Sequence, residues 1–475
     1  MLKEIDALRS TWVPNRNPAV LIGQEQNLTP PPNVEDAEIE ASLRWFFEVS
    51  DAPLELAERV EAARAHYRQS TNFSEGRWVS LDPFDGFEDR MAVIIAQAIG
   101  ELRDRRTRDL FLASEALPFL KIIGEHIDLV RGIPGASDRA RRMLRRTEQH
   151  PDSGIFELAV ALRYAREPGL KVEFIPEQSA RMADFLVRDS DGSDPDGIHI
   201  ECKRLRPSDY EKQEKCHAIE ILNRINDFVH ERKVSLCVDV TFTEELAEVP
   251  ADYLLNWLKA IGSSKVFLPA TYPWKDAFGE GVVSIADLDA VREDIDDSFL
   301  LVGSKLARLL AGGERPEEHF HLVCGGVAHP EDPRFIDEIE YGTVIFWRCL
   351  AEISIEARAR HVRSKLADID RQVAHAPLAI AHIGMDVERD TRTADLRRER
   401  NLATLANFRP NSRLIEVDLH YFMPRTSESV RWMIDETVEP CSRTEAPFLN
   451  ISRILGGSVQ GIVENQPAWR QPVPR

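Results

Sequence analysis

The sequence predicts a mixed α/β (α+β) fold in which a central mixed sheet is flanked by helices. Between residues 170 and 205, apolar and polar side chains alternate with the period of two that is typical of half-buried strands. Just before this stretch, apolar residues recur at helical spacing over residues 154–166. The chain has 475 residues, a length that suits two or three domains. We therefore expect a mainly helical region over 1–130, the central region over 131–250, and an α/β region over 251–475.

The first element of the central region is a helix over residues 154–166. Residues such as Ile155 and Leu162 form one apolar face, and Pro168 marks the end of the helix. The opposite face is apolar as well, so we expect the helix to be buried. Glu157 lies among these apolar residues. A buried carboxylate is rare unless it is paired or binds a metal ion, which makes Glu157 a candidate site residue.

Three strands are expected next, over residues 171–176, 183–188 and 198–205. Turn dipeptides with glycine separate the second strand from the third, as in a meander. Asp184 enters the middle strand. Glu201 and Lys203 lie two positions apart on the third strand, so their side chains share a face about 7 Å apart. A carboxylate and an ammonium group can therefore meet at one substrate atom.

A helix over residues 210–232 and a strand over 234–242 complete the central region. The order helix, three strands, helix and strand, with an acid followed by Glu-x-Lys, resembles the PD-(D/E)xK nuclease superfamily. That family has the restriction-endonuclease-like fold. The resemblance covers about a fifth of the chain, roughly residues 150–242. One departure is Ala183, which stands where the family pattern has proline before the acid.

The resemblance implies a Mg²⁺- or Mn²⁺-dependent phosphodiesterase, with endonuclease activity favoured. Asp184 and Glu201 would bind the metal ion, Glu157 would complete the metal site, and Lys203 would orient or activate the attacking water. The residue types suit this chemistry, because Mg²⁺ prefers oxygen ligands and neutralises the charge of a phosphodiester. A cation beside Lys203 would also lower the pKa of its ammonium group.

Basic residues lie on both sides of this motif. The formal net charge of the chain is -20, but residues 126–206 contain 14 Lys/Arg and 14 Asp/Glu, so the acidic excess lies elsewhere. This balance argues against a sequence-blind DNA coat, whose affinity would come from Lys and Arg. We expect Arg139, Arg142, Arg146 and Arg204 to contact nucleic-acid phosphates; a solvated helix face is the alternative for the cluster ahead of the helix.

Other classes of protein leave no signal in the sequence. No apolar run reaches the length of about 18 residues that a membrane span needs, and no leader peptide is recognisable, so we expect a cytoplasmic protein without a membrane partner. The six cysteines show no Cys-x-x-Cys spacing, and the histidines show no His-Glu-x-x-His. These absences argue against a disulfide scaffold and against a structural zinc site.

The flanking regions carry no recognisable chemistry. The N-terminal part predicts helices over residues 34–47, 52–69 and 87–103. The C-terminal part predicts a long helix over residues 352–373 and strands over 343–347, 378–383 and 414–422. The pattern does not decide whether these strands extend the central sheet or form a separate domain.

The favoured function is a metal-dependent nuclease with DNA as its substrate, in prokaryotic defence or DNA repair by family analogy alone. Two alternatives stay open: a catalytically silent nuclease fold that acts as a binding module in a larger assembly, and an RNA nuclease. An unrelated enzyme in the C-terminal region has no group of residues to support it. A homodimer or a partner protein also stays open. A protein with one active site cuts both strands of DNA only if a second copy binds or if the same site returns to cut the second strand.

Overall fold

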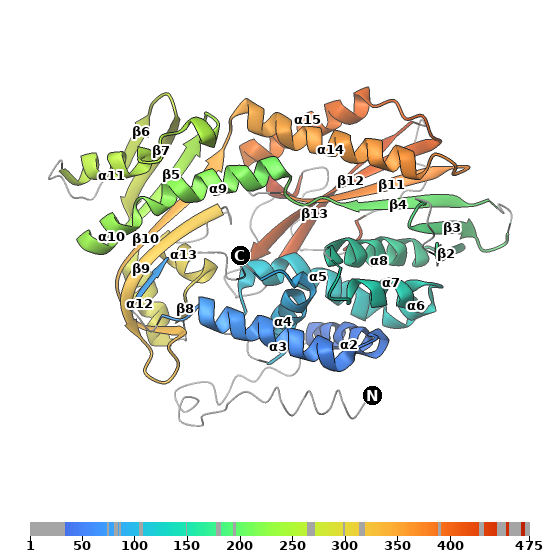
Figure 1. Cartoon of the computed structure of the whole chain (residues 1–475), viewed down its shortest axis with the longest axis horizontal. Coiled ribbons are helices and arrows are strands. Elements are labelled where there is room, and N and C mark those ends of the chain that lie inside the picture. Colours follow the sequence, from blue (N-terminus) through green and yellow to red (C-terminus); the bar gives the residue numbers. More distant parts are fainter. Residues whose placement is uncertain are drawn as a thin grey trace.

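The structure, a computed structural model, contains two mixed sheets that each carry helices on both faces (Figure 1). This confirms the predicted mixed α/β class. The description covers residues 34–73, 76–79, 84, 87–103, 108–148, 150–176, 182–192, 196–263, 271–297, 300–312, 319–387, 391–426, 432–443, 453–455 and 467–470.

Sheet I contains six strands in the spatial order β13-β12-β11-β4-β3-β2. Their bounds are β2 (Leu170–Phe174), β3 (Phe185–Asp189), β4 (Ile198–Arg204), β11 (Ala379–Asp386), β12 (Leu414–Thr426) and β13 (Trp432–Ser442). Strands β2, β3 and β4 form an antiparallel meander, as expected. β11 then pairs parallel to β4, β12 pairs parallel to β11, and β13 closes the edge in antiparallel orientation.

Two groups of helices cover sheet I (Figure 1). One face packs against α2 (Val34–Val49), α3 (Pro53–Ser70), α4 (Arg90–Arg103), α5 (Leu110–Glu125), α6 (Ile127–Gly132), α7 (Ala136–Met143) and α8 (Pro151–Ala165). The other face packs against α14 (Glu352–Gln372) and α15 (Thr391–Asn407). Because the N-terminal helices share one apolar core with α8 and sheet I, they form a layer of this α/β/α unit.

Sheet II has the order β1-β9-β10-β5-β7-β6, with β8 paired to β10. Its strands are β1 (Arg77–Val79), β5 (Leu236–Phe242), β6 (Tyr272–Lys275), β7 (Gly279–Ile285), β8 (Leu300–Leu301), β9 (His319–Ala328) and β10 (Phe335–Cys349). Helices α9 (Asp209–Asn223) and α11 (Tyr253–Ser263) pack on one face. Helices α12 (Leu288–Asp297) and α13 (Ser304–Leu310) pack on the other.

The strand expected over residues 234–242 forms as β5, but it lies in sheet II and not beside β4. The range 131–250 expected for one central region is therefore divided between the two sheets. β5 pairs with β10 and β7. Its Val238, Val240 and Phe242 side chains pack under α9 and α11, whereas the opposite face carries Cys237 together with the polar residues Asp239 and Thr241. The partner of β4 is β11, so the segment between these two strands contains most of sheet II.

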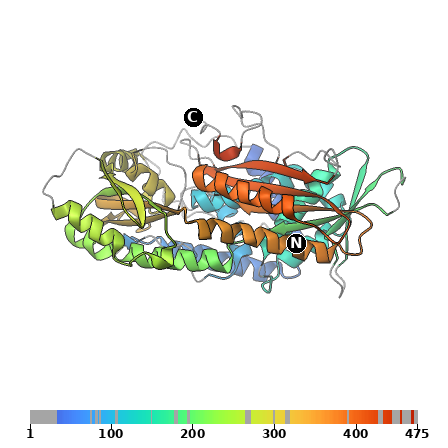
Figure 2. The same ribbon diagram turned by 90° about the horizontal axis from the view of Figure 1, so that it is seen from above.

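The two units lie side by side along the long axis of the molecule (Figure 2). The expected helix over residues 210–232 is interrupted and becomes α9 and α10 (Asn226–Arg232). Glu214 of α9 accepts hydrogen bonds from Ser354 and Arg358 of α14, and all three side chains are buried. This contact joins the unit of sheet II to the helices above sheet I. Within the described part of the chain, none of the helices combines the length and the hydropathy that crossing a bilayer requires.

Candidate active site

Glu157 is buried on α8, as the sequence predicts, with 4% of its surface exposed. α8 begins at Pro151, a residue suited to the first helical turn, and it is apolar nearly all round. The helix packs closely on α7 at Gly154, where a Cβ atom would lie 3.0 Å from Cβ of Met143. The carboxylate is therefore held between α7 and sheet I.

Arg139 of α7 lies inside this group of acids. Its Nε atom is 3.0 Å from Oε2 of Glu157, and its Nη2 atom donates to Oδ1 of Asp184 at 3.4 Å. The guanidinium carbon also lies 5.5 Å from the centroid of the Phe174 ring. The sequence predicts that Arg139 contacts nucleic-acid phosphates. In the structure its side chain is only 8% exposed, and it is paired instead with Glu157 and Asp184, two predicted metal ligands.

Gly135 fixes α7 beside β2. Its φ of 82° is left-handed, and a Cβ atom there would lie 2.7 Å from Cβ of Phe174. The Phe174 amide donates to the carbonyl oxygen of Pro134 at 2.9 Å. Only glycine fits both the backbone conformation and the close approach. This turn therefore sets where Arg139 enters the site.

Asp184 comes directly before β3 and is hydrogen-bonded to the neighbouring strand. Its amide donates to the carbonyl oxygen of Ile200 at 3.0 Å, and its Oδ2 accepts from the amide of Cys202 at 2.7 Å. Asp184 thus lies against β4 at the level of Glu201.

Glu201 and Lys203 form an ion pair through Oε1 of Glu201. Glu201 is 0% exposed, and its Oε2 atom has no hydrogen-bond partner among the described residues. Ile200 and Cys202 point into the core beneath α8, as the strand alternation predicts. The structure therefore gathers Glu157, Asp184, Glu201 and Lys203 in one region through Arg139 and the backbone of β4.

Two acids of this site, Glu157 and Glu201, hold their protons tightly in the protein alone. Burial, followed by the charge of Asp184, raises the pKa of Glu157 to about 8. The same two causes raise the pKa of Glu201 well above its usual value. Burial lowers the pKa of Lys203, but Glu201 and Asp184 outweigh burial, so that its pKa is raised. A lowered pKa for Lys203 is expected only in the presence of a cation, because the protein groups alone favour the ammonium form.

The donor set suits a hard divalent cation. Asp184, Glu201 and Glu157 offer carboxylate oxygens, which Mg²⁺ and Mn²⁺ prefer. The unpartnered Oε2 of Glu201 is an oxygen that a cation could satisfy. Arg139 supplies positive charge at the same place, so it would compete with the ion for Glu157 and Asp184.

The other predicted phosphate contacts differ in their exposure. Arg146 is exposed, and Arg142 is half-buried with its Nε atom 3.5 Å from Glu148. Arg204 lies with its guanidinium carbon 4.8 Å from the centroid of Phe422 and pairs with Asp386. Arg146 is thus the best placed of the four to reach a phosphate from the surface.

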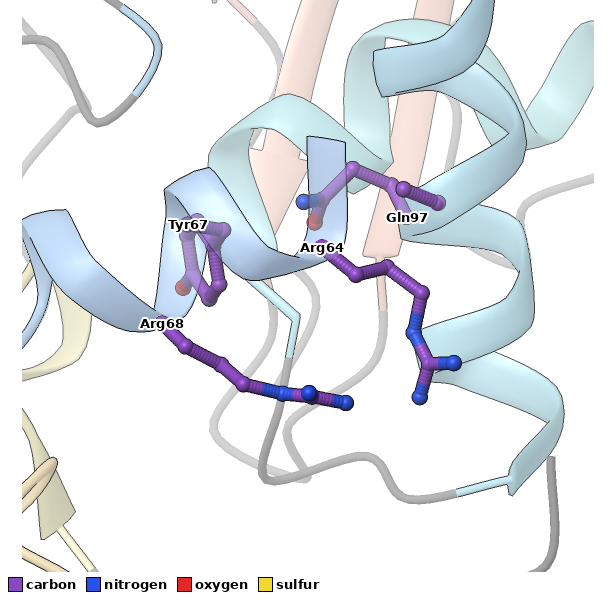
Figure 3. A pocket seen from close by; sticks show the side chains of 5 residues that line it. Arg64, Tyr67, Arg68 and Gln97 are labelled. Carbon is purple, nitrogen blue, oxygen red and sulfur yellow. The ribbon is translucent and has the colours of Figure 1, made fainter. Parts of the chain in front are cut away.

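Two hollows lie away from these acids. A cavity of about 10 Å³ between α3 and α4, lined by Arg64, Tyr67, Arg68, Ala96 and Gln97, has room for a single water (Figure 3). A groove of about 330 Å³ lies between the end of α15, the start of β12 and the end of β13. Neither includes Glu157, Asp184, Glu201 or Lys203 in its lining.

A second group of polar residues, not predicted from the sequence, is buried on β11 and β12: His382, Asp418 and His420. The available signal was the alternation of Glu416, Asp418 and His420 with apolar residues, which places three polar side chains on one face of a strand whose other face is apolar. All six cysteines lie within the described residues, and none of them forms a disulfide in the structure.

No family model matches this chain, and no curated protein matches it.

Proposed function

We propose that this protein is a divalent-metal-dependent nuclease that hydrolyses phosphodiester bonds, with DNA as the favoured substrate. One observation carries the proposal: Asp184, Glu201 and Lys203 lie together at the start of β3 and on β4, with the buried carboxylate of Glu157 beside them. The unpartnered oxygen of Glu201 at this point supports a bound cation.

The order of elements in sheet I gives further support. Helix α8, the antiparallel strands β2, β3 and β4, then helix α14 and the parallel strand β11 repeat the order on which the resemblance to PD-(D/E)xK nucleases rests. The second helix and the parallel strand come from α14 and β11 instead of residues 210–242. On this proposal, sheet II is an insertion between the third and fourth strands of the nuclease core.

Each residue has a distinct task in the proposed reaction. Asp184 and Glu201 would hold Mg²⁺ or Mn²⁺, with Glu157 completing the site, and the ion would neutralise the phosphate and acidify a bound water. Lys203 would donate a hydrogen bond that orients the attacking water. The amide of Cys202 keeps the carboxylate of Asp184 in place through Oδ2. Arg139 holds Glu157 and Asp184 together before the ion binds.

The second candidate is a catalytically silent nuclease fold that binds nucleic acid or a partner. The position of Arg139 favours it, because a guanidinium beside Glu157 and Asp184 already supplies positive charge where the cation would bind. An RNA nuclease would use the same residues, so the polymer that is cut distinguishes it from the DNA nuclease. Action in the cytoplasm, within prokaryotic defence or DNA repair, and a homodimer or a protein partner remain part of the proposal.

The test is cleavage of supercoiled plasmid, and of a structured RNA in parallel, with Mg²⁺ or Mn²⁺ at low salt. We expect wild type to nick or linearise the plasmid, and both Asp184→Asn and Lys203→Met to lower the rate by at least about 100-fold. EDTA should stop the reaction. Glu173→Gln is the matched control, because Glu173 is an exposed acid on β2 that pairs with Arg188 away from the site.

Two results would count against the proposal. Cleavage that persists in Asp184→Asn and Lys203→Met would assign the activity to other residues or to a contaminant. If wild type cuts neither polymer with either metal, the binding module becomes the better account. Circular dichroism and thermal unfolding of each variant would establish that the loss of cleavage does not come from loss of the fold.

A further inference from the structure

Three potential metal ligands lie in the interior of the unit built on sheet I. His382 belongs to β11, and Asp418 and His420 belong to β12. His382 is paired with Asp418 across the two parallel strands, which places both on the face beneath α8. His382 and His420 are 0% exposed and Asp418 is 2% exposed.

The donor atoms of these residues converge. Nδ1 of His382 lies 2.9 Å from Nε2 of His420 and 3.6 Å from Oδ2 of Asp418. One donor atom from each residue lies within 4.8 Å of the other two. Zinc ligands at about 2.0 to 2.1 Å in a tetrahedral site are separated by about 3.3 Å, so these distances are close to those of a zinc site.

The outer nitrogen of each histidine has a partner of its own. Nε2 of His382 lies 2.9 Å from the hydroxyl of Tyr164, and Nδ1 of His420 lies 2.7 Å from Oε1 of Glu436. Glu436 is fixed in turn, because its Oε2 accepts from the amide of Leu455 at 2.9 Å. Histidines that bind metal typically donate their second ring nitrogen to such a partner, which fixes the tautomer and the ring orientation.

Two neutral histidines in a hydrogen-bonded pair would explain only part of this arrangement. Oδ1 of Asp418 is buried and has no hydrogen-bond partner in the part of the chain that the structure describes. The carboxyl group of Asp418 is hydrogen-bonded to the buried side chain of Glu416, but an oxygen atom left without a partner in the interior is costly. A cation between the three residues would satisfy the carboxylate and both inward-facing nitrogens together.

Apolar side chains close the group from above. The ring of Phe156 on α8 lies 5.9 Å from that of His420 in an edge-to-face arrangement. Gly384 leaves space for this ring, since a Cβ atom there would lie 2.9 Å from Phe156. The same donor types serve iron enzymes, but those need open positions for dioxygen and substrate. The burial of all three residues favours an ion with a structural role and no redox chemistry.

We propose that His382, Asp418 and His420 bind one Zn²⁺ ion, which ties β11 to β12 beneath α8. The three protein donors leave a fourth position, which a water molecule or a neighbouring carboxylate would fill. The sequence offered no zinc motif because the ligands lie on two strands far apart in the chain and include no cysteine. This proposal does not depend on the nuclease proposal, since the two sites share no residue.

The first test is the metal content of the full chain, measured by inductively coupled plasma mass spectrometry after growth with zinc and desalting. We expect about one zinc ion per chain in wild type and loss of most of it in His420→Gln and Asp418→Asn. Asp184→Asn, which alters the proposed Mg²⁺ site, should keep its zinc. His375→Gln is the matched control, because His375 is an exposed histidine outside the group.

A second measurement needs only wild type, in case the buried variants fail to fold. Zinc K-edge X-ray absorption should report nitrogen and oxygen neighbours and no sulfur. The proposal would be overturned by wild type without stoichiometric zinc, by His420→Gln with the zinc content of wild type, or by a sulfur neighbour. Another metal bound in place of zinc would overturn the assignment of the ion.

Discussion

Arg139 and Glu157 form a buried ion pair, with Nε of the arginine 3.0 Å from Oε2 of the glutamate and both side chains less than a tenth exposed. The same guanidinium reaches Asp184 at 3.4 Å. In a protein without bound metal, Arg139 provides positive charge beside Asp184 and, once the pH exceeds the Glu157 pKa of about 8, beside an ionised Glu157. Removing one partner of a buried pair leaves an uncompensated charge, which costs more stability than the pair itself contributes.

Replacement of Arg139 is therefore expected to make stability depend on a divalent ion. At about pH 9, where Glu157 is ionised because its pKa is about 8, we expect Arg139→Gln to lower the free energy of unfolding in EDTA by about 3 to 5 kcal/mol. Mg²⁺ should restore part of this loss, because an ion bound only to the folded state stabilises it by mass action. Urea unfolding with and without Mg²⁺ measures both effects.

The control for this experiment is Arg188→Gln, which removes an exposed partner of Glu173 on sheet I. It should change the free energy of unfolding by less than about 1 kcal/mol with or without Mg²⁺. If Arg139→Gln is destabilised equally in EDTA and in Mg²⁺, the acids do not bind the ion, and the binding module gains support.

The raised pKa of Glu157 predicts that the metal requirement falls as the pH rises. Burial and the charge of Asp184 raise this pKa to about 8, so at neutral pH the carboxyl group keeps its proton in the absence of metal. A ligand must lose its proton before it binds a cation. The Mg²⁺ concentration for half-maximal cleavage should therefore fall by up to about tenfold per pH unit until the pH exceeds about 8, if one proton is released.

The control variant is Glu157→Gln, in which this dependence on pH should be weaker. An unchanged dependence in that variant would assign the released proton to another group.

The raised pKa of Glu157 also predicts that the metal-free protein loses stability as the pH rises. The folded state binds this proton more tightly than the unfolded state, whose Glu pKa is near the ordinary value of 4.5. The resulting stabilisation is fully present below about pH 4.5 and is lost as the pH rises through about 8. Unfolding in EDTA over this range should show the decline, and Glu157→Gln should reduce it.

Local elements were predictable from the sequence, because their periodicity is set by which side chains are buried. The expected helix over 352–373 is α14, and the strands expected over 378–383 and 414–422 are β11 and β12. Glu157, Asp184, Glu201 and Lys203 were found by spacing and by a carboxylate in an apolar helix. These signals depend on neighbours within a few residues.

The partners of the strands were not predictable in the same way. The pattern of β5 predicts a buried face made of Val238, Val240 and Phe242, but any sheet covered by a layer of helices satisfies that requirement. The pairing of His199 with Ala379 joins strands that are separated by most of sheet II. The place of Arg139 was also missed, because a cluster of arginines on a short helix gives no sign of which side chain turns inward. The group of His382, Asp418 and His420 likewise depends on the pairing of β11 with β12.

Arg146 and Arg204 should differ in their contribution to nucleic-acid binding. Arg146 is exposed, whereas Arg204 is packed on Phe422 and paired with Asp386. The salt dependence is the slope of the logarithm of DNA affinity against the logarithm of salt concentration. We expect Arg146→Ala to reduce the magnitude of this slope by about one, and Arg204→Ala to leave it unchanged. Arg204→Ala should lower the free energy of unfolding by about 1 to 2 kcal/mol through the lost cation–π contact and ion pair.

Fluorescence anisotropy of a labelled duplex, titrated at several salt concentrations in Ca²⁺ to limit cleavage, measures these slopes. An identical slope for wild type and Arg146→Ala would remove Arg146 from the binding surface. A lower slope for Arg204→Ala at unchanged stability would mean that Arg204 leaves Phe422 to meet the phosphate backbone.

Gly135 provides a test of how α7 positions the site without altering a charged residue. Gly135→Ala meets two obstacles, a φ of 82° and a Cβ position 2.7 Å from Cβ of Phe174. We expect a loss of about 1 to 3 kcal/mol in the free energy of unfolding, because a non-glycine residue in this conformation is strained and the neighbouring backbone must shift. The shift would move Arg139 away from Glu157 and Asp184, so metal-dependent cleavage should also fall.

Gly132→Ala is the matched control three residues earlier, since a Cβ atom at Gly132 meets nothing within 4 Å. Urea unfolding and plasmid cleavage are measured for both variants. The comparison distinguishes an effect specific to the position of Gly135 from the effect of replacing any glycine with alanine. Equal behaviour of Gly135→Ala and Gly132→Ala would mean that the turn before α7 does not set the position of Arg139.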